Sequence, residues 1–93
     1  MWGRPPAGKL RWQMTQFLLS HSHEPGECAA AFAAWNGTAS PLRGDVAWAG
    51  CAHGTHSVYW RVEAPDPGAA LALLPEYVAT RTTATPVRKV VIP

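Results

Sequence analysis

The side chains with the widest scope for chemistry in this sequence are its four histidines and two cysteines. They are His21, His23, His53, His56, Cys28 and Cys51. Imidazole is the commonest metal ligand in proteins, and thiolate suits zinc, copper(I) and nickel. Glu24 and Glu27 lie near the first pair of histidines and could add oxygen ligands or orient the imidazoles. Because no Cys-x-x-Cys or His-Glu-x-x-His motif is present, a metal site requires the fold to bring these residues together.

The first two histidines lie at the end of a predicted strand. Residues 15–23 alternate between apolar and polar side chains, which is typical of a half-buried strand. His21 and His23 are two residues apart and therefore point to the same face. A helix is predicted over residues 24–35, and we expect its dipole to lower the pKa of the Cys28 thiol near its start.

The other two histidines flank a predicted hairpin turn. Strands are expected over residues 46–53 and 56–63, and Gly54-Thr55 fits a two-residue turn between them. That turn pairs His53 with His56 across the two strands, so that both side chains lie on one face.

The remaining elements complete an α+β domain. Asp66-Pro67 is typical of a helix start, and Pro75 is expected to kink or split that helix. A connection over residues 82–85 and a last strand over 86–92 follow. The order strand-helix-strand-strand-helix-strand is the ferredoxin-like order. It predicts a four-stranded antiparallel sheet, in the spatial order 4-1-3-2, with two helices on one face.

This topology delivers all four histidines and Cys28 to one edge of the sheet. We therefore predict a transition-metal site, for nickel, copper or zinc, in a protein of metal handling or sensing. Its ligands would be His21, His23, His53 and His56, with Cys28 and Glu24 in reserve. Cys51 is expected to be a buried packing residue rather than a ligand, and a disulfide with Cys28 is not expected in a reducing compartment.

Two other functions remain open at this point. Trp35 and Trp60 are expected in the core, whereas Trp48 and Tyr59 fall on the opposite sheet face and could line a pocket or a dimer interface. A pocket would suit a monooxygenase- or isomerase-like enzyme acting on a small aromatic ligand, with a histidine, His23 or His53, as general base. If the histidines instead bond to backbone groups, the chain is a structural or interaction module without a ligand.

Size and composition set the remaining expectations. The chain has 93 residues, enough for one domain over residues 14–93, and the Gly- and Pro-rich residues 1–13 are expected to form a disordered arm. The net charge of +2 comes from scattered basic residues, which argues against nucleic acid. No run approaches the ~20 apolar residues of a membrane span, and no signal peptide is recognised, so we expect a cytoplasmic protein.

The element order, the hairpin over residues 51–60 and the Val-Glu-Ala-Pro-Asp-Pro stretch at residues 62–67 together resemble a known superfamily. It is that of the small dimeric α/β-barrel proteins of ferredoxin-like fold. This superfamily includes uncharacterised bacterial proteins, nickel-binding members, and cofactor-free or haem-degrading monooxygenases. The resemblance implies a homodimer, and the Ala- and Arg-rich composition suggests a bacterial source. Such cues concern the fold and carry little function by themselves.

Overall fold

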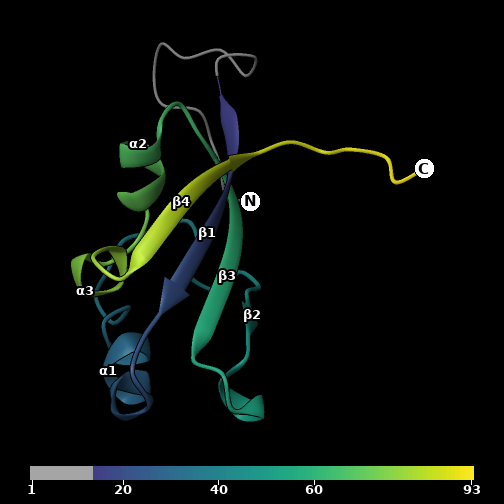
Figure 1. Ribbon diagram of the computed structural model, residues 1–93. Helices are drawn as coiled ribbons and strands as arrows, with labels where there is room; N and C mark the ends of the chain where they lie inside the picture. The colour runs from purple at the N-terminus through teal and green to yellow at the C-terminus, as the bar shows by residue number, and fades with distance from the viewer. Residues whose placement is uncertain (1–13) are drawn as a thin grey trace.

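The computed structural model describes residues 14–93 and shows a four-stranded antiparallel sheet with short helices (Figure 1). The elements, in chain order, are β1 (Thr15–Ser22), η2 (Pro25–Glu27), α1 (Cys28–Ala33), β2 (Trp48–Ala49), η3 (Cys51–His53), β3 (Ser57–Ala64), α2 (Pro67–Leu71), α3 (Glu76–Ala79) and β4 (Thr82–Val87). The predicted α+β class is confirmed. The disordered arm expected over residues 1–13 lies outside the described residues.

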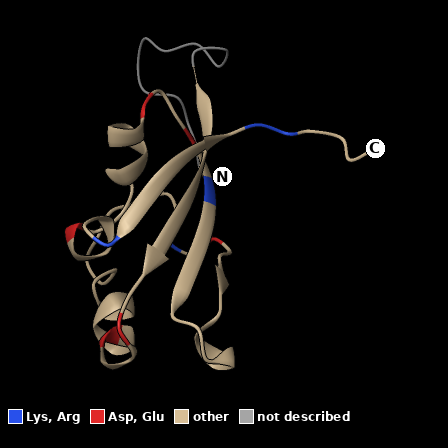
Figure 2. Cartoon of the chain, viewed as in Figure 1, with Lys and Arg blue, Asp and Glu red and all other residues tan. Residues whose placement is uncertain are grey.

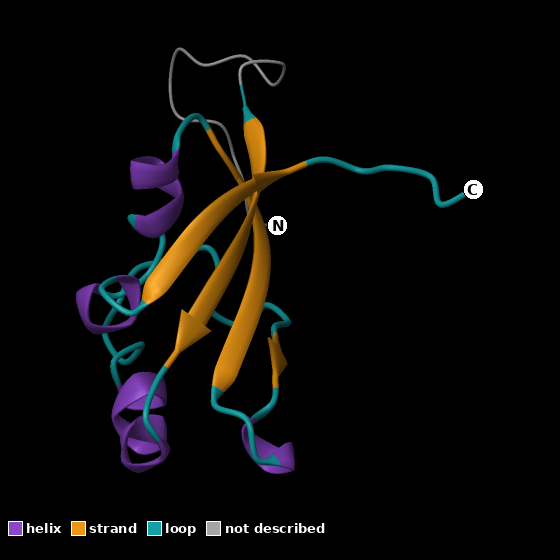
Figure 3. Ribbon diagram, viewed as in Figure 1, coloured by secondary structure: helices purple, strands orange, loops and turns teal. Residues whose placement is uncertain are grey.

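The strands follow the order β2-β3-β1-β4 across the sheet, which is 4-1-3-2 when it is counted from β4. Strand β1 is antiparallel to both of its neighbours, β3 and β4, and β2 is antiparallel to β3. The α-helices gather on one side of the sheet (Figure 3), and α2 contacts β1, β3 and β4. One sheet face is therefore covered, and the apolar side chains that alternate along the two central strands pack beneath the helices.

The covered face carries the hydrophobic core. Its buried members are Phe17, Leu19, Leu42, Val58, Trp60, Val62, Ala64, Ala70, Leu74 and Val78. Trp35 packs against this cluster with its ring 6.0 Å from that of Trp60. Trp48 and Tyr59 lie on the opposite face and are exposed, Trp48 to 69%. Both placements of the aromatic residues are as predicted, and the homodimer that this open face suggested stays a prediction.

Proline and an acidic cap determine where the helices of the second half begin. The Asp66 side chain accepts a hydrogen bond of 2.8 Å from the backbone N–H of Ala69 and so caps α2. Pro75 has no backbone N–H to continue a helix, and it separates α2 from α3 as predicted. Leu74 and Val78 on either side of it are buried in the core.

The hairpin differs from the prediction. Strand β2 has only two residues, and Ala49 lies opposite Val58. The backbone N–H of Gly50 donates to Ser57 O at 3.0 Å, so continuing the ladder places Cys51, rather than His53, opposite His56. This shift of two residues keeps the side chains of β2 and β3 on their predicted faces, because side chains alternate with a period of two.

A tight turn replaces the end of the expected second strand. The N–H groups of His53 and Thr55 both donate to Gly50 O, at 2.8 and 3.2 Å, instead of joining the β3 ladder. Gly54 ends the turn with φ of 91°, a left-handed conformation that glycine adopts without strain. These local hydrogen bonds convert the residues that were expected to extend the strand into η3.

The last strand was also predicted too late in the chain. Strand β4 begins at Thr82, opposite His21, and ends at Val87, opposite Gln16. The β-branched threonines that were expected to form a connection suit a pleated sheet instead. Beyond β4 the chain runs away from the sheet (Figure 1), with Val91 exposed to 93%.

Gly50 provides a test of the hairpin loop. A Cβ atom at this position would overlap Thr55 Oγ1 and come within 3.5 Å of Thr55 O. We therefore expect Gly50→Ala to lower the free energy of unfolding by about 1–3 kcal/mol, the usual cost of overpacking. Gly26→Ala is the matched control, because its added Cβ would meet nothing within 4 Å. Chemical denaturation of both variants checks this, and equal stabilities would contradict the structure of the loop.

Candidate metal centre

Four side chains meet at the end of the sheet where β1 finishes and β3 begins. They are His23, Cys28, Cys51 and His56, and one ligand atom from each lies within 4.8 Å of all the others. His23 Nε2 is 3.2 Å from Cys28 Sγ and 3.6 Å from Cys51 Sγ, and Cys28 Sγ is 3.1 Å from His56 Nδ1. Tetrahedral zinc, with Zn–N near 2.0–2.1 Å and Zn–S near 2.3 Å, requires N···S separations of about 3.5 Å. The observed separations lie within a few tenths of an ångström of that value.

The strand ladder brings the four residues together. Ser22 at the end of β1 pairs with Ser57 at the start of β3, and the next residues continue the ladder, with His23 N donating to His56 O at 3.0 Å. Cys28 then begins α1 beyond η2. Cys51 begins η3 in the hairpin loop. Two loops therefore supply one histidine and one cysteine each.

The loop between His23 and Cys28 is held by the Glu27 carboxylate. Its Oε1 accepts a hydrogen bond of 2.9 Å from the backbone N–H of Glu24. Its Oε2 accepts from Tyr77 Oη at 3.0 Å and from Arg81 Nη2 at 3.2 Å. These bonds, the backbone one foremost, hold the pKa of Glu27 below its ordinary value, whereas burial raises the pKa of the Tyr77 hydroxyl. The carboxylate thus joins the loop to α3 and to the residues that lead into β4.

His21 lies behind the cluster and determines how His23 is oriented. Its Nδ1 is 3.3 Å from Val78 O and 3.2 Å from Thr82 Oγ1, and the Thr82 hydroxyl already donates to Val78 O at 2.7 Å. Both neighbours of Nδ1 are therefore acceptors, so Nδ1 carries the ring proton. Burial lowers the pKa of His21 and favours the neutral ring.

The tautomer of His21 determines which ring nitrogen of His23 carries the proton. Because His21 is neutral and protonated on Nδ1, its Nε2 has a free lone pair, which accepts the Nδ1–H of His23 at 2.9 Å. His23 consequently presents the lone pair of its own Nε2 to the two sulfurs. A metal-ligating histidine usually donates its other ring N–H to an acceptor that fixes the ring, and here that acceptor is an imidazole nitrogen.

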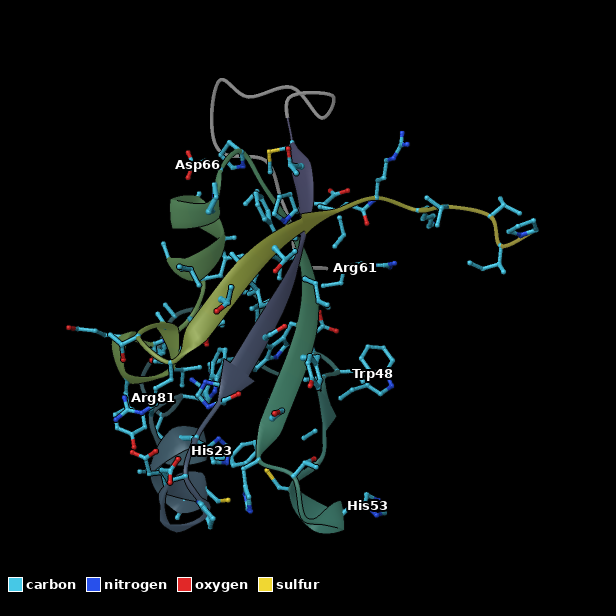
Figure 4. The ribbon with its side chains drawn as sticks, in the orientation of Figure 1. His23, Trp48, His53, Arg61, Asp66 and Arg81 are labelled. Atoms are coloured by element: carbon cyan, nitrogen blue, oxygen red, sulfur yellow. The ribbon has the colours of Figure 1, made fainter. Side chains whose placement is uncertain are left out.

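The residues proposed as ligands from the sequence therefore separate into three groups. His23, His56 and Cys28 come together in the cluster. His21 is 1% exposed and contacts His23 rather than the sulfurs. His53 and Glu24 are exposed and lie outside the cluster, with His53 at the far end of η3 (Figure 4).

The two cysteines differ from their expected roles. Cys51 is half-buried with its sulfur in the cluster, instead of being a fully buried packing residue. The pKa of the Cys28 thiol is raised rather than lowered, first by burial and then by the neighbouring Cys51. Helix α1 has only six residues, which leaves little dipole to oppose that effect. Both cysteines are free.

The spacing of the four residues is a signal that the sequence contained. His23 and Cys28 are separated by four residues, and so are Cys51 and His56, which gives the mirrored pattern His-x4-Cys and Cys-x4-His. A search for equal spacings of histidine and cysteine would have placed Cys51 in the set.

No protein-family model, curated protein or solved structure matches this chain. None of the helices in residues 14–93 combines the length and the apolar character that crossing a bilayer requires. Basic side chains are spread along this part of the chain instead of gathering on one element (Figure 2), and the absence of a nucleic-acid partner stays a prediction.

A hollow of about 380 Å³ lies beside the core, and it bears on the enzyme alternative. Its lining residues are Phe32, Trp35, Leu42, Arg43, Gly44, Asp45, Ala47, Ala49, Val58 and Trp60. No histidine or cysteine is among them. The space that reaches His21 and His23 measures about 10 Å³, which is at most enough for one water molecule. Within the described residues, the hollow offers no imidazole as a general base.

His21 allows the orientation of His23 to be tested separately from ligation. We expect His21→Ala to weaken zinc binding about 10- to 100-fold, the usual effect of losing the group that supports a metal-bound histidine. His21→Gln retains an acceptor for the His23 N–H and should recover part of the affinity. Competition with a chromogenic chelator measures both variants. Equal affinities for the wild type and His21→Ala would show that this contact does not orient His23.

Proposed function

We propose that this protein binds a transition metal ion through His23, Cys28, Cys51 and His56. The observation that carries the proposal is the convergence of two imidazole nitrogens and two sulfurs within 4.8 Å of one another. Such a set is chemically specific, since exposed carboxylates, which often cluster without a metal, take no part in it.

Zinc is the ion that these donors favour most. Two nitrogens and two sulfurs are a common zinc ligand set, and zinc accepts tetrahedral geometry without preference from its d electrons. Copper(I) shares the affinity for thiolates, whereas nickel(II) in such sites favours a square-planar arrangement. The choice of zinc therefore rests on the donor set, and the N···S separations of 3.1 to 3.6 Å are short enough for one ion to contact both kinds of donor.

Four protein ligands leave no coordination position for a substrate, so we infer metal holding or sensing rather than catalysis. The ion would join the loop after β1 to the loop before β3. His23 is buried, but Cys28, Cys51 and His56 are only half-buried. Partial exposure of three ligands suits an ion that exchanges with the surrounding solution.

The finer assignments made from the sequence enter here as proposals. The β-α-β-β-α-β element order and the strand order support a ferredoxin-like domain. The exposed Leu18, Trp48 and Tyr59 on the uncovered face support a homodimer. Two free cysteines suit a reducing compartment such as the cytoplasm.

The test is metal analysis of the full chain purified without a histidine tag, followed by titration of the metal-free protein. We expect one zinc ion per chain. Cobalt(II) substitution should give the absorption bands of a tetrahedral thiolate site, because both sulfurs would ligate the ion. Binding weaker than about 10 μM, near −7 kcal/mol, would reject the proposed function.

A further inference from the structure

The two cysteine sulfurs form a pair within the proposed centre. Cys28 and Cys51 are the only cysteines of the chain, and they come from different loops. Their Sγ atoms lie within 4.8 Å of each other. A disulfide requires an S–S distance near 2.05 Å, so the sulfurs would approach by at most about 2.8 Å. Side-chain rotation together with a small movement of the η3 loop can supply a shift of that size.

The surroundings of the sulfurs allow this approach. Both cysteines are half-buried and free, so that a small oxidant can reach them from solution. The loop of Cys28 is held to α3 through Glu27, whereas that of Cys51 is a short turn closed by Gly54. We therefore expect the Cys51 side to make the larger movement.

We propose that Cys28 and Cys51 are a site of reversible oxidation, at which a hydroperoxide converts the two metal-binding thiolates into a disulfide and releases the ion. This inference rests on the proposed metal-binding function. Only His23 and His56 would remain as ligands, and two imidazoles retain a zinc ion far less tightly than the full set. The disulfide would then replace the ion as the link between the two loops.

The chemistry balances with a hydroperoxide as the only co-reactant. One thiolate attacks the O–O bond, an S–O bond forms, and the leaving alkoxide takes up a proton to become an alcohol. The second thiolate attacks the resulting sulfenic acid, the S–S bond forms, and the hydroxide that leaves is protonated to water. Two sulfurs are oxidised and one peroxide is reduced, with the uptake of two protons. A dithiol reverses the reaction by exchange.

The experiment treats the zinc-loaded full chain with hydrogen peroxide. A chromogenic chelator reports the released zinc, and alkylation of the remaining thiols followed by peptide mapping reports the disulfide. We expect one zinc ion for each intrachain Cys28–Cys51 disulfide, and recovery of zinc binding after dithiol treatment. His53→Ala should behave as the wild type, and Cys51→Ser should form no intrachain disulfide.

The outcomes separate the two proposals. A protein that binds zinc but yields sulfinic acids, or disulfides only between chains, would overturn the redox proposal and leave the metal-binding function standing. A protein that binds no zinc, tested in a parallel metal-free arm, would overturn the metal-binding function even if the disulfide forms. In that case the coupling of oxidation to metal release would fall with it.

Discussion

Changing Cys51 to Ser should lower the zinc affinity of this protein by about 100- to 1,000-fold, whereas changing His53 to Ala should leave it unaltered. Structural zinc sites bind with about 10–16 kcal/mol, so that one ligand of four contributes about 2.5–4 kcal/mol. The Sγ of Cys51 is 3.6 Å from His23 Nε2 and belongs to the cluster. His53 lies on the same 3-10 turn, but its side chain is exposed and lies outside the cluster.

The two variants form a matched pair, because the substituted residues share a turn and are two positions apart. Both affinities are measured by competition with a chromogenic chelator, and circular dichroism of each variant checks that the fold is retained. The opposite result, with His53→Ala weakening the binding and Cys51→Ser leaving it unaltered, would restore the hairpin register predicted from the sequence. That register places His53 opposite His56.

Zinc should stabilise the fold by about 4 kcal/mol when free zinc is a thousandfold above its dissociation constant. An ion that binds the folded state alone shifts the unfolding equilibrium by this amount. For a domain of 60–100 residues, about 4–8 °C of melting temperature corresponds to each kcal/mol, so a rise of roughly 15–30 °C is expected. The unfolded chain is not expected to bind the ion, because the ligands come from two loops that are far apart in the unfolded chain.

Thermal unfolding of the protein with zinc and with a chelator measures this shift. The double variant Cys28→Ser/Cys51→Ser is the control, and zinc should no longer raise its melting temperature. A melting temperature that is unaffected by zinc in the wild type, at concentrations where metal analysis shows binding, would mean that the ion does not join the two loops.

Local sequence determined most of the elements and their faces. The alternation of apolar residues in 15–23 predicted β1, Asp66-Pro67 predicted the start of α2, and Pro75 predicted its separation from α3. These features depend on interactions between near neighbours in the chain: side-chain periodicity, a capping carboxylate and a missing N–H. The short β2 and the position of β4 were missed, because a local turn and pairing with β1 decide them.

The sequence alone was also sufficient to indicate which end of the sheet would gather the histidines. Strand direction and element order are enough for that, and they bring His23, His56 and Cys28 together. They cannot decide which residue of the hairpin faces His56, since a shift of two residues preserves the alternation of faces. Only the pairing of the folded strands, in which Ala49 lies opposite Val58 and the N–H of Gly50 donates to Ser57 O, places the sulfur of Cys51 there instead of the imidazole of His53. The role of His21 as a partner of His23 also depends on the tertiary structure, because its contacts with Val78 and Thr82 join residues more than fifty positions apart in the chain.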